Sequence, residues 1–399
     1  MSKILVIGAA VYQVPAIQRI RELGFDAYCV DYKEGQPGFA IANDYRIIDV
    51  RDRDACLKYA KELGIDGVMT WGSTLTLQTV SFIASALSLN ALPMEASLIS
   101  TDKYLIRKRL TDYGLNVGGY VFKIHSCEDF ANHPYTLPFV VKPCDGSGSK
   151  GVRIVREESE IKDALEYALE GARNGEVYVE PYIEGREYSV EAYACNGEVY
   201  LYSIVKTCFK WNTDYPIYTQ TTYLDLSEAD IYSIEEEVKK AVYALGVNMG
   251  PINFDLILSA KDNKPYIIDV GIRNGQNLIA SHIVPFSRGV DELNNSIYLS
   301  LGYRIDARPV QKKFITSRLL IYPPGRITGI LPYYSLIGRN NIVDIILKKQ
   351  VGDILPRYQT KSDTCGWVLT LGDTPEESLH YANEAWELLK DFFIISKDV

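Results

Sequence analysis

The first ninety residues alternate short apolar runs with segments of helical periodicity, and this alternation restricts the possible folds more than any other feature. Ile4–Ile7 is apolar throughout, as in a strand buried on both faces, and Val14–Leu23 has helical spacing and ends at Gly24. Such alternation predicts right-handed crossovers and a doubly wound parallel sheet over residues 1–95. We expect further strands at Ala27–Val30, Tyr45–Val50 and Gly67–Trp71, with helices at Asp54–Leu63 and Leu75–Leu87.

The turn after the first strand argues against a dinucleotide site in this domain. Of a GxGxxG pattern it keeps only the first glycine, Gly8, so a pyrophosphate could not approach the backbone closely. Asp31 does stand where a ribose-binding acid would be. We therefore interpret this domain as a structural α/β domain that forms one wall of a site, rather than as an NAD-binding domain.

Composition restricts the class of protein. A chain of 399 residues with 47% hydrophobic and 23% charged residues fits two to three globular domains. Its net charge of −9 disfavours nucleic acid or an anionic membrane as a main partner. The seven cysteines form no CxxC pair, which is typical of reduced thiols. With neither a signal peptide nor an apolar run of about 18 residues, a soluble cytoplasmic protein is expected.

The pattern changes near residue 95. Pro93 and the stretch Ser97–Thr101 resemble a boundary, and Thr101 or Asp102 then caps a helix predicted over Lys103–Tyr113. Strands and helices mix over 96–305. A last segment, 306–399, contains predicted strands at Phe314–Tyr322 and Gly366–Leu371 and a helix from about Pro375 to Phe392.

The segment Phe139–Val155 predicts a strand, a glycine-rich loop and a second strand. Glycines let backbone N–H groups fold around phosphate oxygens, and the loop includes Ser147 and Gly148. Lys142 leaves the first strand just before the loop and could place its charge on a phosphate. A tight hairpin with a solvated lysine would explain the segment about as well.

Two further motifs carry carboxylates. In Val177–Ala192, an apolar strand ends at Glu180 and a second begins near Glu187, which suits a linker between lobes whose acids accept hydroxyl donors; solvated turn acids are the alternative. Farther on, Asp255 and Asp269 stand on two neighbouring predicted strands in apolar surroundings. Two acids that face one point are typical of a hard-cation site, and Arg273 could bind a phosphate bidentately. A structural Asp–Arg pair is the alternative.

In order and spacing these motifs resemble the ATP-grasp superfamily, especially its carbamoyl-phosphate-synthase-like and carboxylate–amine ligase branches. Residues 1–95 are similar to the family's preceding Rossmann-like domain, 96–305 to its two-lobed grasp domain, and 306–399 to its small C-terminal α+β domain. The resemblance implies a site that binds ATP with Mg²⁺ or Mn²⁺. It assigns phosphate contacts to Lys103 and Lys142, the phosphate lid to Ser147 and Gly148, the adenine linker to Glu180, Tyr182 and Ile183, the ribose to Glu187, the metal to Asp255 and Asp269, and the reacting phosphate to Arg273.

One motif departs from the family. The usual Glu-x-Asn-x-Arg is here Asp269-Val270-Gly271-Ile272-Arg273, so Gly271 removes one side-chain ligand. Asn253 or water could complete the metal shell. A weakened second metal site, or a member that has lost catalysis, therefore remains an alternative.

The resemblance implies an ATP-dependent ligase. It would join a small-molecule carboxylate to an amine or ammonia through an acyl phosphate and release ADP and phosphate. The resemblance also suggests a homodimer. The alternatives are a carboxylase or formyl-phosphate enzyme of purine-biosynthesis type, and a non-catalytic ATP-binding protein. Lys206 is expected to bind phosphate, with Trp211 or Tyr215 lining the acceptor pocket, although aromatic packing would also explain this stretch.

Overall fold

The computed structural model describes residues 1–146, 150–211, 216–360 and 363–396. Its N-terminal part is a parallel sheet in the order β3-β2-β1-β4, which confirms the predicted α/β fold class. The strands are β1 (Lys3–Ile7), β2 (Asp26–Asp31), β3 (Asp44–Ile47) and β4 (Gly67–Met69), and the helices between them are α1 (Val14–Glu22), α2 (Arg53–Leu63) and α3 (Leu77–Leu87).

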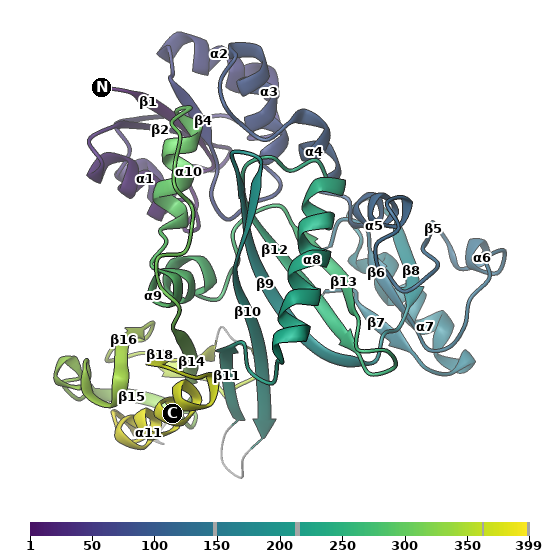
Figure 1. Ribbon diagram of the computed structural model, residues 1–399. Helices are drawn as coiled ribbons and strands as arrows, with labels where there is room; N and C mark the ends of the chain where they lie inside the picture. Colours follow the sequence, from purple (N-terminus) through teal and green to yellow (C-terminus); the bar gives the residue numbers. More distant parts are fainter. Residues whose placement is uncertain (147–149, 212–215, 361–362, 397–399) are drawn as a thin grey trace.

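Helices cover both faces of this sheet. Leu5 and Ile7 pack with α2 and α3 on one face, whereas Ile4 and Val6 pack with α1 on the other. Ile297 of α10 (Glu292–Ser300) joins the second face, so a helix distant in sequence completes the N-terminal layer (Figure 1). Local periodicity gave no sign of this contact.

Between this layer and the next, the chain is helical. Helix α4 (Met94–Ile99) occupies much of the stretch interpreted as a boundary. Helix α5 (Lys103–Asp112) begins where predicted, and its cap is Asp102, which accepts from the backbone N–H of Leu105 at 3.1 Å. Lys103 is therefore fixed at the first turn of a helix.

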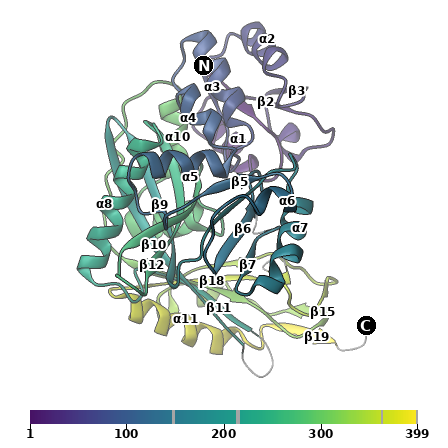
Figure 2. The same ribbon diagram turned by 90° about the vertical axis from the view of Figure 1, so that its right-hand side faces the viewer.

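A small antiparallel sheet follows, in the order β5-β8-β6-β7. Its strands are β5 (Phe122–Ile124), β6 (Phe139–Pro143), β7 (Arg153–Val155) and β8 (Val177–Pro181), with α6 (Cys127–Phe130) and α7 (Ile161–Gly171). An apolar core that includes Phe139, Leu165 and Val179 joins α7 to the sheet. We call this part the small lobe; Figure 2 shows it in front of the larger sheet.

The larger sheet has eight strands in the order β13-β12-β9-β10-β11-β14-β18-β16. They are β9 (Gly185–Cys195), β10 (Glu198–Trp211), β11 (Pro216–Thr222), β12 (Gly250–Ser259), β13 (Pro265–Gly271), β14 (Phe314–Leu320), β16 (Ile342–Leu347) and β18 (Gly366–Gly372). Helix α8 (Glu228–Ala244) covers the β9–β12 end, and α11 (Pro375–Leu389) packs on β14 and β18. The strands of 306–399 thus extend the same sheet.

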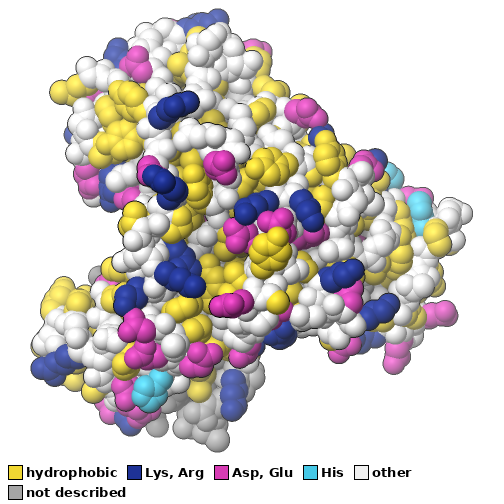
Figure 3. All heavy atoms as spheres, viewed as in Figure 1, with side chains coloured by type: hydrophobic (Ala, Val, Ile, Leu, Met, Phe, Trp, Pro, Cys, Tyr) yellow, Lys and Arg dark blue, Asp and Glu magenta, His cyan; other side chains and the backbone are white. Residues whose placement is uncertain are grey.

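One more α-helix and three more strands remain among the described residues. They are the short helix α9 (Val284–Arg288) and a three-stranded sheet of β15 (Gly325–Ile330), β17 (Ile354–Leu355) and β19 (Phe393–Ser396). On the face drawn in Figure 3, basic and acidic side chains alternate over α8, where Lys239 lies 2.9 Å from Glu235. Among the helices described, none combines the length and apolarity needed to cross a bilayer.

Candidate functional site

Three strands of the large sheet place a polar row on one face. Ser189 of β9 lies opposite Asp255 of β12, and Asp255 lies opposite Asp269 of β13. The Ser189 hydroxyl donates to Asp255 Oδ1 at 2.6 Å. Alternate residues of β12, including Phe254 and Leu256, point to the core beneath α8. The period of two along a strand therefore presents both aspartates on the face away from that core.

A β-bulge in β13 keeps the two aspartates side by side. Asp255 pairs with Asp269, but the next residue, Leu256, pairs with Ile267, so Ile268 is the extra residue. The bulge lets Asp269 stay on the polar face while Ile267 stays in the core. The Ile268 carbonyl accepts from Lys142 Nζ at 3.1 Å. Lys142 of the small lobe is thereby brought next to the aspartates.

Two lysines hold Asp269 in its charged form. Both of its carboxylate oxygens contact Lys103 Nζ. Burial opposes ionisation, but the ammonium charges of Lys103 and Lys142 outweigh it and hold the pKa of Asp269 below its ordinary value. At Asp255, burial raises the pKa, and the charge of Asp269 adds to this effect. Paired acids and two cations thus meet at one point of the sheet.

The buried carboxylate of Glu180 forms an ion pair with Lys142. This carboxylate, 2% exposed, lies 2.6 Å from Lys142 Nζ and 2.5 Å from Arg107 Nη2. Arg107 also donates to the carbonyls of Ile267 and Val117. The side chain of Glu180 is therefore used to anchor two cations. Sequence reasoning missed Arg107; the signal was a charged residue one helical turn beyond Lys103, between the apolar positions Ile106 and Leu110.

The predicted adenine linker joins the two lobes. The Tyr182 N–H donates to the carbonyl of Pro138 at 3.1 Å, and the guanidinium of Arg156 lies 5.0 Å from its ring centre. The side chain of Ile183 packs so closely on Gly118 that a Cβ there would come within 2.9 Å of it. Glu187 is exposed on β9, on the same face as Ser189. Glu187 therefore borders the polar row of Ser189, Asp255 and Asp269.

Lys206 is not brought to this face. Val205 lies opposite Ser189, so the next residue, Lys206, points to the other side of the sheet, where it pairs with Asp225. Ser147, Gly148 and Tyr215 lie outside the described residues, and the side chain of Trp211 is likewise not described. The structure therefore brings together Lys103, Lys142, Asp255 and Asp269, borders them with Glu187 and Arg273, and separates Lys206 from them.

Arg273 lies in a loop that is fixed by a buried acid. A Cβ at Gly271 would lie 3.3 Å from Cζ of Arg273, so the guanidinium folds over Gly271. Glu191 of β9, fully buried, accepts from the Gly275 N–H at 2.7 Å. It also faces the buried Glu292, and burial raises the pKa of Glu191 to about 7. Sequence reasoning missed Glu191, although Glu187, Ser189 and Glu191 alternate on one face.

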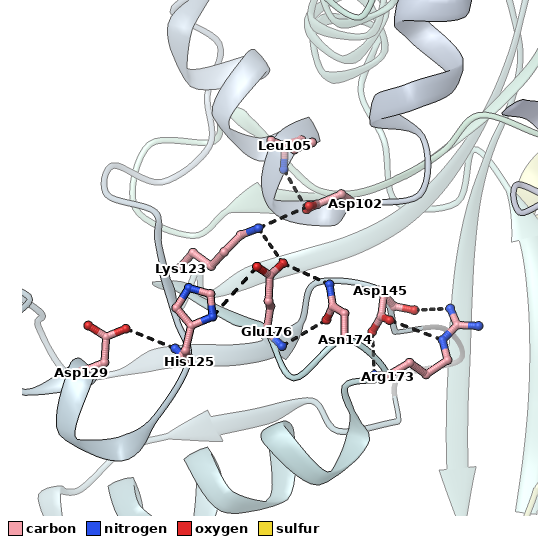
Figure 4. Close-up of polar contacts among 9 residues, drawn as sticks. All are labelled: Asp102, Leu105, Lys123, His125, Asp129, Asp145, Arg173, Asn174 and Glu176. Carbon is pink, nitrogen blue, oxygen red and sulfur yellow. Dashed lines mark hydrogen bonds and ion pairs between the residues drawn. The ribbon is translucent and has the colours of Figure 1, made fainter.

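A polar network fixes the helix that carries Lys103 (Figure 4). Lys123 Nζ lies 2.7 Å from Glu176 and 3.4 Å from Asp102, the cap of α5. Asp145, where the glycine-rich loop begins, accepts from the Arg173 N–H at 3.0 Å. The N–H of Lys103 itself donates to the carbonyl of Cys144 at 2.8 Å. Lys103 and the base of the glycine-rich loop are thus parts of one framework.

A mainly apolar pocket lies where the N-terminal sheet meets this site. It is partly open, and the space of about 640 Å³ that its walls outline includes open solvent. It lies at the carboxyl end of β4, the usual ligand side of a parallel sheet, and Arg273 and Asn274 contribute to its wall. The N–H of Gly72 donates to Asn274 Oδ1 at 2.9 Å, which joins the two layers. Its other side chains include Val68, Met69, Trp71, Leu77, Val80, Leu92 and Met249.

Comparisons with known proteins agree with this architecture. Residues 135–280 match the ATP-grasp domain, and residues 318–390 match the L-amino acid ligase C-terminal domain 2. Dapdiamide A synthase of Enterobacter agglomerans is 26% identical over 317 residues, 75% of this chain and 73% of that protein. Formate-dependent phosphoribosylglycinamide formyltransferase of Methanocaldococcus jannaschii is 29% identical over 188 residues, 45% of this chain and 48% of that protein.

The chain spans about half the length of two of the curated relatives that it matches, the formyltransferase among them. Among solved structures, an L-amino acid ligase from Bacillus licheniformis has a TM-score of 0.77 at 23% identity, over 100% of this chain and 99% of that one. This likeness shows the fold. The chain therefore contains an ATP-grasp domain, followed by an L-amino acid ligase C-terminal domain.

Proposed function

We propose that this protein is an ATP-dependent ligase that joins a small-molecule carboxylate to an amine through an acyl phosphate. The single observation that carries the proposal is the meeting of Asp255 and Asp269 with Lys103 and Lys142 on one face of the large sheet. Such phosphoryl transfer depends mainly on positioning and on neutralising charge. The names of the relatives, a dapdiamide synthase and an L-amino acid ligase, support the carbon–nitrogen bond.

The donor set fits Mg²⁺, and Mn²⁺ as well. Both aspartates offer carboxylate oxygens, which hard cations prefer, and their cross-strand pairing suits a shared ion. Lys103 now neutralises Asp269 and would be released toward a phosphate when a cation takes its place. When bound, the metal supplies charge neutralisation on the phosphates of ATP.

Side chains of the protein would bind the nucleotide and steady the transferred phosphate. Lys142, held by Glu180, would contact the phosphates, and Glu187 the ribose. Arg273 would steady the transferred phosphate, which turns a poor electrophile, the carboxylate, into an acyl phosphate with a good leaving group. The glycine-rich loop, Ser147 and Gly148 included, would exclude water, which otherwise hydrolyses that intermediate. The amine then attacks, and phosphate leaves.

The pocket beside Arg273 supports a substrate with an apolar part. Its wall is formed mainly by aliphatic side chains and Trp71, with Arg273 as a charged residue of the lining. Burial of an apolar side chain there contributes roughly 25 cal/mol per Å². A carboxylate or amine that carries an aliphatic or aromatic group fits this wall better than a highly polar one.

The test is ADP release with pooled carboxylates and amines, followed by mass detection of the adduct. Asp269→Asn keeps the shape of the side chain and removes its charge, so we expect kcat/KM to fall by roughly 10²–10³ or more while the protein stays folded. Full activity of that variant would remove the metal assignment. Bicarbonate and formate form separate arms, because a phosphate burst with either one alone would support the carboxylase or formyl-phosphate alternative instead. ATP binding without phosphate release in any arm would indicate a non-catalytic protein.

A further inference from the structure

The row next to the two aspartates contains an asparagine. One step along the strands from Asp255 and Asp269, Asn253 of β12 lies opposite Gly271 of β13. Positions 253 and 271 are therefore related to the aspartate pair in the same way, each two residues along its own strand and diagonal to the other acid. A side chain at either position can reach the same space.

The amide of Asn253 has a defined orientation. Its Nδ2 donates to Glu191 Oε2 at 3.0 Å and to the carbonyl of Val190 at 3.3 Å, both on β9. A backbone carbonyl only accepts, so the nitrogen must face β9. The Oδ1 is then turned the other way, toward β13, where Gly271 has no side chain.

Glu191 makes this orientation rigid. It is 0% exposed and also accepts from the Gly275 N–H at 2.7 Å. Gly275 has no room for a side chain, because a Cβ there would lie 2.5 Å from Glu191 Oε2. The acceptor that holds Asn253 is thus itself fixed by the loop that carries Arg273.

A neutral oxygen at this place would add to the two carboxylates of Asp255 and Asp269. Over the described part of the chain, no group of three or more His, Cys, Asp or Glu side chains is placed to hold a metal. We propose that Asn253 Oδ1 is the neutral oxygen ligand that Gly271 cannot supply, so that β12 contributes two ligands and β13 one. The inference rests on the proposed function, since it assumes a divalent cation at Asp255 and Asp269.

The experiment measures metal affinity rather than turnover. Mn²⁺ is titrated into the full-length protein with a non-hydrolysable ATP analogue, and free Mn²⁺ is followed by electron paramagnetic resonance. Asn253→Leu keeps the size of the side chain and removes the oxygen, so we expect Mn²⁺ affinity to fall about 10–100-fold, while binding of the analogue without metal is unchanged. Thermal unfolding verifies the fold, and Asn253→Ala replaces the leucine variant if that one does not fold.

A second variant tests the equivalence of the two positions. Adding Gly271→Asn to Asn253→Leu should restore most of the lost affinity, because the oxygen returns from the opposite strand; only the flexible end of Arg273 must move. Gly271→Asn alone is the control. If Asn253→Leu binds Mn²⁺ as tightly as the native protein does, the inference is overturned. This holds even if the KM for the carboxylate rises in that variant. A native protein that binds no Mn²⁺ with the analogue would instead overturn the proposed function.

Discussion

Asp255 and Asp269 face each other but lie in different electrostatic surroundings. The lysines keep Asp269 charged, whereas burial raises the pKa of Asp255. A cation that displaced Lys103 would therefore find one carboxylate ready and would help the second to ionise. With a divalent cation held by Asp255 and Asp269, Lys103 would be free to contact the phosphates of ATP. An acid pair without the lysine would repel itself in the absence of metal.

A second acid pair gives a prediction for pH and stability. Glu191 and Glu292 are both 0% exposed, and no donor from the described residues reaches either oxygen of Glu292. Burial raises the pKa of Glu191 from 4.5 to about 7 and that of Glu292 well above its ordinary value. A raised carboxyl pKa stabilises the fold at low pH, and this stability is lost as pH rises through the folded value.

We therefore expect the native protein to have a lower Tm at pH 8 than at pH 6, by several degrees. In Glu292→Gln the amide can donate to the Glu191 carboxylate, so the difference between the two pH values should shrink. Thermal unfolding at both values measures this. The matched control is Glu184→Gln, which removes an exposed carboxylate and should leave the difference as in the native protein. If the difference in Tm between pH 6 and pH 8 is the same in both variants, the buried pair of Glu191 and Glu292 does not cause it.

At the scale of the element, α5 joins stability to nucleotide binding. Asp102 caps the helix and Lys103 is its first residue, so loss of the cap should fray the turn that carries Lys103. We expect Asp102→Ala to cost about 1 kcal/mol of unfolding free energy and to raise the KM for ATP several-fold. Urea unfolding and steady-state kinetics measure the two effects.

Helix α2 supplies the control. Asp52 caps it through the same kind of bond, in which the Ala55 N–H donates to Asp52 Oδ1 at 3.0 Å, in the N-terminal layer. Asp52→Ala should cost a similar free energy and leave the KM for ATP unchanged. If both variants raise KM equally, the effect follows general loss of stability and not the position of Lys103.

Elements were the level at which the sequence was most informative. The apolar runs and caps predicted β1–β4 and α5, and the spacing of Asp255 and Asp269 predicted neighbouring strands, because these features are local. The bulge at Ile268 was not predictable, since it depends on which β12 residue each β13 residue pairs with. Helix α4 was interpreted as a boundary because Pro93 and the serines near it resemble a turn, although Pro93 directly precedes the helix.

At the scale of the whole molecule, the apolar pocket should select the substrate. Leu77 lines it from α3, and Leu77→Trp should fill part of it. We expect KM to rise roughly 10-fold or more for carboxylates or amines with a bulky apolar group, and little for the smallest ones or for ATP. A series of substrates of graded size measures this. Leu75→Trp, an exposed position on the same segment, is the control. A uniform rise across the series would place the substrate elsewhere.

Contacts between segments that are distant in the sequence could not be predicted from it. Ile297 of α10 packs under the N-terminal sheet, and Arg19 Nη1 of α1 lies 2.7 Å from Asp291, which caps α10. Glu191 reaches Gly275 in the same way. No local period reports such pairs, so the sequence pattern gave no sign of these contacts.

The eight-stranded sheet has a consequence for how the chain can be divided. Strand β11 pairs with β14 through residues such as Thr221 and Thr316. The outer edge of β11 is therefore hydrogen-bonded only when residues 306–399, which include β14, are present. A fragment cut near residue 305 would leave that row of backbone groups open to neighbouring molecules. Aggregation, rather than a well-behaved catalytic core, is the expected fate of such a truncation.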